Sequence, residues 1–306
     1  MILCVGLSPA WQRHMYFDDL EMDEVNRAAG GKLFSSGKAL NAVITAHCLG
    51  APCLGLTFCG GLQGEAMRED MKRRGIAFEG VETEAQTRCC TTLINRATGE
   101  VTELVESAPP VKPQELETLR QAILAHSDRA TIAVLSGSMP LGAPPETFHK
   151  LVDKTGLDIV ADIRGPELLK LLPLRPLIVK PNQEELAKTL GTPTDSEDAL
   201  KDAMQSLATR GARWVVISQG AGAVLVYGEG TFHRLRPPRI ESVNPIGAGD
   251  AFAAGIAVAC SRGLEVLEAV RFGMAAAVDK VCRLYQWEST PESVSSRVTD
   301  IDVERL

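Results

Sequence analysis

The feature that most constrains this chain is a regular alternation of short apolar runs with stretches of helical periodicity. The apolar runs have the length of buried strands and lie at 2–7, 53–59, 131–136, 158–163, 177–180 and 214–218. The helical stretches lie between them, at 38–49, 65–74, 113–125, 144–154 and 197–209. Strands that are apolar throughout are covered on both faces, so this order predicts an α/β fold with a parallel sheet between helices. Ligands of such sheets bind beyond the carboxyl ends of the strands.

Two segments interrupt the alternation. Residues 13–34 mix polar and apolar side chains without a convincing helix, and residues 88–106 resemble two strands joined by a turn at 95–99. Two such excursions within an α/β chain can form a small separate sheet. On these residues alone, a surface hairpin without function is the simpler interpretation.

Charge and cysteine content exclude several classes of protein. The chain has 306 residues and a net charge of −7, without the basic surplus that is typical of nucleic-acid binders. Its eight cysteines form no CxxC pair and no zinc-site spacing, which favours reduced thiols over a disulfide framework. No apolar stretch approaches the roughly 20 residues of a membrane span. We therefore expect a cytoplasmic protein whose partners are neither nucleic acid nor membrane.

The most informative motif is Asn-Pro-Ile-Gly-Ala-Gly-Asp at 244–250, which opens a helix of small residues. Gly247 and Gly249 permit backbone conformations in which N–H groups converge at the helix N-terminus, a favourable place for an anion. A carboxylate at Asp250 would repel that anion, but it is well placed as a base for an attacking hydroxyl. A plain N-terminal cap is the alternative for Asp250. A dinucleotide-binding fingerprint fits poorly, because the third glycine spacing is absent.

Residues 244–255 resemble the signature of the ribokinase-like PfkB carbohydrate kinases, and the Asn-Pro is similar to the branch of 1-phosphofructokinases and tagatose-6-phosphate kinases. Four more segments resemble motifs of this family in the same order, at 7–10, 25–27, 36–41 and 180–185. The resemblance implies a three-layer α/β/α fold with a mostly parallel sheet and a small β lid. The main domain would comprise 1–10, 36–87 and 107–306, and the lid 11–35 and 88–106.

The reaction that the resemblance implies is ATP-dependent phosphorylation of a sugar hydroxyl, with a ketohexose phosphate as the expected acceptor. Asp250 would be the base, and the backbone of Gly247, Ala248 and Gly249 would hold the transferring phosphoryl group. Such a base contributes roughly 10²–10⁴-fold to the rate.

Residues on the nucleotide side follow from the same resemblance. They are expected at Lys180, Asn182, Ser218, Gly220 and Gly222. Glu185 would organise Mg²⁺ through water, since Mg²⁺ usually keeps several waters. Structural alternatives stay open: Asn182 and Glu185 also fit a capping box, the 218–222 loop an ordinary connection between strands, and Lys180 a solvated strand end.

On the sugar side, the family's substrate-binding positions fall on Gln12, Gly37, Lys38, Asn41 and Arg88, with Arg27 a weaker candidate. The planar fork of an arginine suits a phosphate already on the substrate.

Three departures from the family pattern lie among the expected sugar-binding positions. Gln12 stands where the family has Asp, and Ser36 and Ala39 replace glycines. Gln12 loses a negative charge and gains an amide donor, which predicts an altered sugar preference. The departures put the substrate in question more than the type of reaction.

Two alternatives to a ketohexose-phosphate kinase are open at this stage. One is a kinase of an unphosphorylated sugar or sugar-like alcohol, and the other is a non-catalytic sugar-phosphate sensor on the same fold. The intact Asp250, loop glycines, Asn182 and Glu185 argue against the sensor. A homodimer formed through the lid is a further expectation.

Overall fold

The central element is a ten-stranded sheet in a computed structural model that describes residues 1–306. Its order is β14-β13-β12-β11-β10-β9-β8-β1-β4-β5. The parallel strands are β1 (Ile2–Val5), β4 (Cys53–Cys59), β5 (Phe78–Glu82), β8 (Ile132–Ser136), β9 (Asp158–Asp162), β10 (Ile178–Val179) and β11 (Trp214–Ser218). Three strands add an antiparallel edge: β12 (Val224–Gly228), β13 (Thr231–Arg236) and β14 (Asp302–Arg305).

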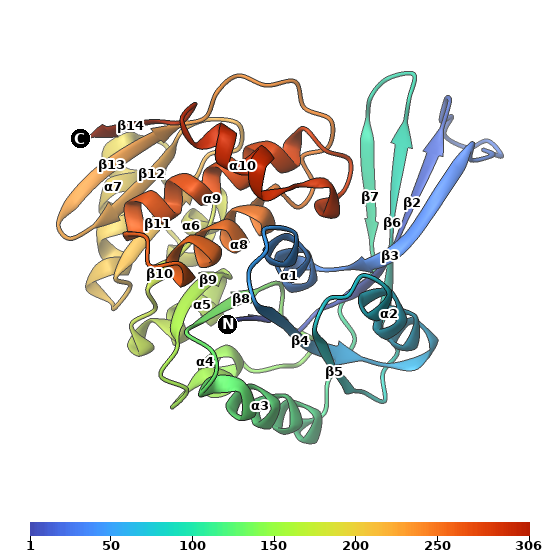
Figure 1. The fold of residues 1–306 in the computed structure, drawn as a ribbon, viewed down its shortest axis with the longest axis horizontal. Coiled ribbons are helices and arrows are strands. Elements are labelled where there is room, and N and C mark those ends of the chain that lie inside the picture. Colours follow the sequence, from blue (N-terminus) through green and yellow to red (C-terminus); the bar gives the residue numbers. More distant parts are fainter.

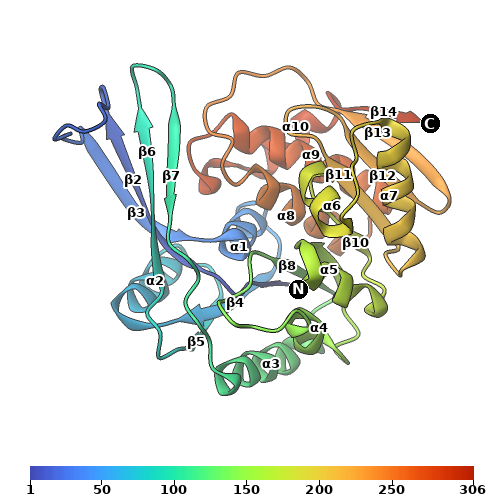
Figure 2. The same ribbon diagram turned by 180° about the vertical axis from the view of Figure 1, so that it is seen from behind.

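Helices cover both faces of this sheet (Figures 1 and 2). One face carries α1 (Lys38–Cys48), α2 (Gly61–Arg73), α8 (Ala248–Ser261), α9 (Val266–Val281) and α10 (Pro291–Val298). The other carries α3 (Pro113–Ser127), α4 (Thr147–Val152), α5 (Gly165–Leu171), α6 (Gln183–Leu190) and α7 (Glu197–Thr209). Two single turns complete the chain, η1 (Leu172–Leu174) and η2 (Gln286–Glu288). The three-layer α/β/α fold is as predicted.

The alternation of side chains along β1 shows how one strand supports two cores. Ile2 and Cys4 belong to the core under α8 and α9, whereas Leu3 and Val5 belong to the core under α3 to α7. All four are fully buried. Successive side chains of a strand point to opposite faces, so a strand between two helical layers must be apolar at every position.

A second, four-stranded sheet stands out from the main body (Figures 1 and 2). Its order is β3 (Gly30–Ser36), β2 (Ala10–Phe17), β6 (Arg88–Asn95) and β7 (Val101–Val105). The register aligns Gln12 with Phe34 and Cys90, and His14 with Thr92. These side chains therefore share one face of the sheet, because register fixes which residues point the same way. The division into main domain and lid stays a prediction.

Element boundaries differ from the expected ranges in a few places. The helix expected at 65–74 begins at Gly61, and the one expected at 144–154 is shortened to Thr147–Val152. Prolines precede the second helix, and Lys154 after it adopts a φ of 67°, which no α-helix accommodates. The antiparallel edge, β12 to β14, was not predicted. No helix combines the length and apolarity that a membrane crossing requires.

Candidate active site

The glycine motif forms the entry to α8, at the carboxyl end of the sheet. Gly247 caps the helix with a left-handed backbone (φ 82°), which explains why glycine is needed there. The N–H of Ala248 donates to the carbonyl of Pro245 at 3.2 Å, but those of Gly249 and Asp250 donate to no main-chain carbonyl. Two N–H groups at a helix N-terminus are thus available to an anion.

The Asp250 carboxylate lies in the first turn of this helix and is 5 % exposed. Its Oδ2 accepts a hydrogen bond of 2.7 Å from Asn41 Nδ2, on α1. Burial raises the pKa of Asp250 to about 7, and the nearby Lys38 and the Asn41 hydrogen bond only partly offset this effect. A general base works best with a pKa near the working pH, and burial brings the pKa of Asp250 into that range.

A buried ionic group lies next to Asp250. Asp162, at the end of β9, contacts Lys180 Nζ at 2.9 Å and Lys38 Nζ at 3.5 Å, and it accepts a hydrogen bond of 3.1 Å from Ser136 Oγ. Burial would raise the pKa of Asp162, but the two ammonium groups outweigh it and hold that pKa below its usual range. The carboxylate therefore keeps its charge and fixes two cations beside the glycine loop.

Lys180 is 3 % exposed, so it is not the solvated strand end that was one interpretation of the sequence. A Cβ added to Gly249 would lie 3.8 Å from its Nζ. The ammonium group is thus close to the place where the loop can bind an anion. Sequence reasoning missed Asp162, although a carboxylate at the end of an apolar strand was a usable signal.

Asn182 and Glu185 form the capping box that was the structural alternative for them. Asn182 Oδ1 accepts from the Glu185 N–H at 2.8 Å, and Glu185 Oε2 accepts from the Asn182 N–H at 3.0 Å. Arg164 adds an ion pair of 3.1 Å to Glu185 Oε1. No group of three or more His, Cys, Asp or Glu side chains is arranged to hold a metal ion.

The 218–222 loop lies beside this capping box. Ser218 ends β11 and forms a bridge with Asn182, which joins the two predicted nucleotide segments. Gly220 adopts a φ of 61° and is exposed, as is Gly222. The loop therefore has an accessible backbone next to the start of α6.

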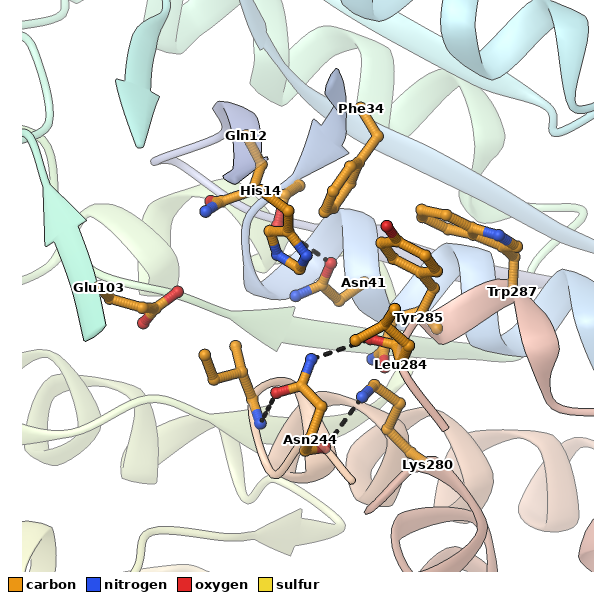
Figure 3. A pocket seen from close by; sticks show the side chains of 13 residues that line it. Gln12, His14, Phe34, Asn41, Glu103, Asn244, Lys280, Leu284, Tyr285 and Trp287 are labelled. Atoms are coloured by element: carbon orange, nitrogen blue, oxygen red, sulfur yellow. Dashed lines mark hydrogen bonds between the residues drawn. The ribbon is translucent and has the colours of Figure 1, made fainter. Parts of the chain in front are cut away.

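An open pocket of about 370 Å³ lies between the small sheet and the glycine motif (Figure 3). Of the residues expected on the sugar side, Gln12 and Asn41 contribute to its lining, together with Ser36. Asn244 and Ile246, from the glycine motif, also line it. Sequence reasoning missed the rest of the lining, which comprises His14, Phe34, Glu103, Lys280, Leu284, Tyr285, Gln286 and Trp287. The period-two pattern of the expected hairpins was the available signal for His14 and Glu103.

Ser36 and Ala39 stand where the family has glycines, and the neighbouring residues show how the chain accommodates them. Gly37 caps α1 with a φ of 109°, and a Cβ there would lie 3.0 Å from the Cα of Pro9. Ala39 is buried opposite Gly6, where an added Cβ would come within 2.5 Å of the Ala39 Cβ. The glycine at position 6 therefore makes room for the alanine at position 39. Ser36 donates to Asn41 Oδ1 at 3.3 Å.

The two arginines of the predicted sugar side lie in different surroundings. The guanidinium of Arg88 donates to the main-chain carbonyls of Ser8 (3.0 Å), Pro9 (3.2 Å) and Glu106 (2.8 Å). It therefore fastens β6 to the chain ahead of β2. Arg27 is exposed in the loop between β2 and β3, at the far end of the small sheet.

Comparison with known proteins agrees with this arrangement. The family model described as "pfkB family carbohydrate kinase" matches residues 1–291. The chain therefore belongs to the pfkB family of carbohydrate kinases, and it is an ATP-dependent sugar kinase.

Three individual proteins show which members of the family this chain is similar to. The chain is 29 % identical over 279 residues to a 1-phosphofructokinase of Borreliella burgdorferi, with 90 % of each chain covered. Phosphofructokinase-2 from Escherichia coli has a similar structure, with a TM-score of 0.89 and 23 % identity over 97 % of this chain and 98 % of that one. A protein of Thermotoga maritima described as a possible 1-phosphofructokinase has a TM-score of 0.91 at 23 % identity, with 100 % of this chain and 99 % of that one covered. At this identity the two structures support the fold.

Proposed function

We propose that this kinase transfers the γ-phosphoryl group of ATP to a hydroxyl of a ketohexose phosphate, with Asp250 as the base. The observation that carries the proposal is the 2.7 Å hydrogen bond between Asn41 and Asp250. Asn41 also lines the 370 Å³ pocket, so this bond places the buried carboxylate at the pocket's edge. A hydroxyl bound there would meet the base on one side and the glycine loop on the other.

The proposed mechanism depends on charge placement more than on covalent chemistry, as is usual in phosphoryl transfer. Asp250 would accept the proton of the attacking hydroxyl. The free N–H groups of Gly249 and Asp250 would bind the transferring phosphoryl group, and Lys180, held by Asp162, would balance its charge. Loss of one such preorganised donor costs about 3–4 kcal/mol in a comparable enzyme site.

ATP would extend from the glycine loop toward the 218–222 loop. The accessible backbone of Gly220 and Gly222 and the bridge between Ser218 and Asn182 support this placement. Mg²⁺ would enter as part of the ATP complex, because Mg²⁺ keeps several waters and is usually held by substrate phosphates with few protein ligands. Glu185, fixed by its capping box and by Arg164, would bind the waters of that ion.

The acceptor class rests on the pocket lining and on the relatives. The Borreliella burgdorferi relative is named a 1-phosphofructokinase, which favours a ketohexose phosphate for this chain also. Gln12, whose Nε2 donates to Thr92 at 2.8 Å, occupies the sugar side of the pocket and would alter the family's usual preference. Lys38 and Arg88 would meet the phosphate already on the sugar, whereas Arg27, in the exposed loop between β2 and β3, would reach it only if that loop folded over the pocket.

An unphosphorylated sugar or sugar-like alcohol is the second candidate acceptor, and one observation favours it. The Arg88 guanidinium already donates to three carbonyls, so a phosphate would have to displace one of them. The sensor alternative does not apply to an ATP-dependent kinase.

A homodimer formed through the small sheet is the assembly we propose. The register places Arg13, Leu33 and Leu104 on the face of this sheet opposite the pocket. Leu33 and Leu104 are 43 % and 53 % exposed, and both belong to edge strands. An uncovered apolar sheet face favours association with a second copy. We expect the enzyme to act in the cytoplasm. The small sheet, over 11–35 and 88–106, would be its lid.

Coupled measurement of ATP turnover over a panel of ketohexoses and their phosphates tests the acceptor. The proposal predicts the highest kcat/KM for a ketohexose phosphate, with low turnover of its dephosphorylated form. A higher kcat/KM for an unphosphorylated sugar would favour the second candidate. Gln12→Asp supplies the matched variant, and it should increase kcat/KM for the family's usual substrates if Gln12 determines the preference.

A further inference from the structure

A buried ammonium group in the pocket wall forms no ion pair with a carboxylate. Lys280, near the end of α9, is 2 % exposed. Its Nζ donates to the main-chain carbonyl of Asn244 at 3.1 Å (Figure 3), and to that of Arg283 at 3.2 Å. Lysine is almost never fully buried unless it is paired, and here its partners are uncharged carbonyl oxygens. Neither the proposed proton transfer nor the proposed nucleotide site uses this group.

The two carbonyls belong to segments that meet behind the glycine loop. Asn244 begins the glycine motif, and residues 281–288 run from the last residue of α9 into the segment after it. Further contacts join these segments: Asn244 Nδ2 donates to the carbonyl of Leu284 at 2.8 Å, and Gln286 Nε2 donates to the carbonyl of Gly247 at 2.9 Å. The Asn244 N–H also donates to the carbonyl of Val281, at 3.1 Å. The 281–288 segment therefore supports the loop that presents Gly249 and Asp250.

Lys280 is the charged member of this set of contacts, and its charge has a specific effect. Two carbonyl oxygens that point to one place repel each other unless a donor or cation lies between them. A hydrogen bond from an ammonium group is about twice as strong as one from a neutral donor. If the ammonium group were removed, both carbonyls would lose their donor in a site that water enters poorly. A buried acceptor without a donor is costly, which is why the buried charge is tolerated here.

We propose that Lys280 is a positioning residue whose ammonium group serves as a built-in monovalent cation for the glycine loop. It holds the Asn244 carbonyl, and through it the start of the motif, in the arrangement that lets Gly249 and Asp250 receive the phosphoryl group. Because the cation is covalently attached, turnover needs no K⁺ or NH₄⁺ from solution. This inference rests on the proposed role of the loop in phosphoryl transfer.

The unmodified enzyme gives the first test. ATP turnover is measured with its best sugar substrate in K⁺, NH₄⁺ or tetramethylammonium salts at matched ionic strength and constant Mg²⁺. Tetramethylammonium is too large for a carbonyl site and has no N–H to donate. Equal kcat in all three salts is expected, and strong stimulation by K⁺ or NH₄⁺ would overturn the proposal.

Two variants give the second test, since they differ only in the space they leave. Lys280→Ala opens room for a free cation, whereas Lys280→Met fills it with an uncharged chain. Both should lose about 10²-fold in kcat, the order of loss for a misplaced reacting group. NH₄⁺ should restore much of the kcat of Lys280→Ala, but not that of Lys280→Met. Wild-type kcat in Lys280→Met, or no recovery of Lys280→Ala with either K⁺ or NH₄⁺, would overturn the proposal.

Hydrogen exchange gives a readout that does not depend on the substrate. Peptides covering 244–255 should exchange faster in Lys280→Met than in the wild type, while peptides from α3 should be unchanged. If the wild type phosphorylates no sugar, the proposed function fails, and exchange alone then decides whether Lys280 holds the loop. Unchanged exchange over 244–255 would contradict the inference. If neither variant folds, the salt comparison on the wild type decides.

Discussion

At position 250, burial has a larger effect on the carboxylate than any neighbouring charge. Lys38 and Lys180 both favour the ionised form, yet burial raises the pKa of Asp250 to about 7. The base is active when ionised, so the proton must leave before catalysis. We therefore predict that kcat/KM rises with pH through about 7, whereas an exposed aspartate would give a limb near 4.

The measurement is kcat/KM for the best sugar from pH 5 to pH 8, which are about two units below and one above the predicted midpoint. Asn41→Ala is the matched variant, because it removes a hydrogen bond that lowers the pKa of Asp250. The acid limb should therefore move to higher pH in Asn41→Ala. A flat profile across this range in the wild type would remove Asp250 from proton transfer.

Arg88 combines a structural role with a proposed substrate role. Three main-chain carbonyls accept from its guanidinium, and the contact with Glu106 is on the exposed side. We predict that Arg88→Ala raises KM for a sugar phosphate more than KM for the dephosphorylated sugar. The variant should also lose about 1–3 kcal/mol of unfolding free energy, because buried acceptors lose their donor.

Arg88→Lys separates these two roles, since it keeps the charge and loses the fork. Its KM for a sugar phosphate should stay closer to the wild-type value than that of Arg88→Ala. Its stability in urea should still be lower than that of the wild type. Equal rises in KM for both sugars in Arg88→Ala would assign Arg88 to structure alone.

Among the elements, α8 and α9 pack unusually closely. A Cβ on Gly255 would lie 2.8 Å from the Cα of Gly273, and one on Gly273 would lie 2.6 Å from Ile256 Cγ1 and 2.7 Å from the Phe252 carbonyl. This approach allows α9 to carry Lys280 to the back of the glycine loop. Two facing glycines were visible in the sequence, but neither helix shows by itself which partner it approaches.

We predict that Gly273→Ala destabilises the protein by about 1–3 kcal/mol, the usual cost of overpacking a tight contact. Urea unfolding followed by circular dichroism measures it. Glu268→Ala, on the exposed side of the same helix, is the control and should change stability by less than about 0.5 kcal/mol. Equal stability of Gly273→Ala and the wild type would mean that the helices can separate freely.

The parallel strands and most helices could be predicted, because a strand between two helical layers is apolar throughout. The antiparallel edge could not. β13 has only six residues and no regular alternation of polar and apolar side chains, and β14 pairs with it from the far end of the chain. For the site, local motifs predicted Asp250 and Asn41, which the structure joins by a hydrogen bond. Asp162 and Lys280 act through contacts with other elements, at Lys180 and the Asn244 carbonyl, and no local pattern shows which residues these contacts join.

At the scale of the whole molecule, the small sheet turns one face to the pocket and exposes Leu33 and Leu104 on the other. If this outer face joins two copies, a charge on it should separate them. We predict that Leu33→Asp combined with Leu104→Asp converts a dimer to a monomer, because like charges would be buried at the interface. Light scattering after size-exclusion chromatography measures the mass.

The matched control places the same substitution elsewhere. Leu62→Asp and Leu141→Asp change exposed leucines outside the small sheet, at 78 % and 70 % exposure, and should leave the mass unchanged. A wild-type protein that is monomeric throughout would contradict the proposed assembly, as would a dimer that both pairs of substitutions leave intact.

The central claim is that Asp250 and the glycine loop transfer a phosphoryl group from ATP to a sugar phosphate. The most direct test compares kcat of the wild type with that of Asp250→Asn on the best ketohexose phosphate, with ATP binding measured by calorimetry. Asn keeps the shape of the side chain and an acceptor for Asn41, but it cannot take a proton. We predict unchanged ATP affinity and a loss of kcat on the order of 10²-fold or more. A kcat close to that of the wild type would contradict the account.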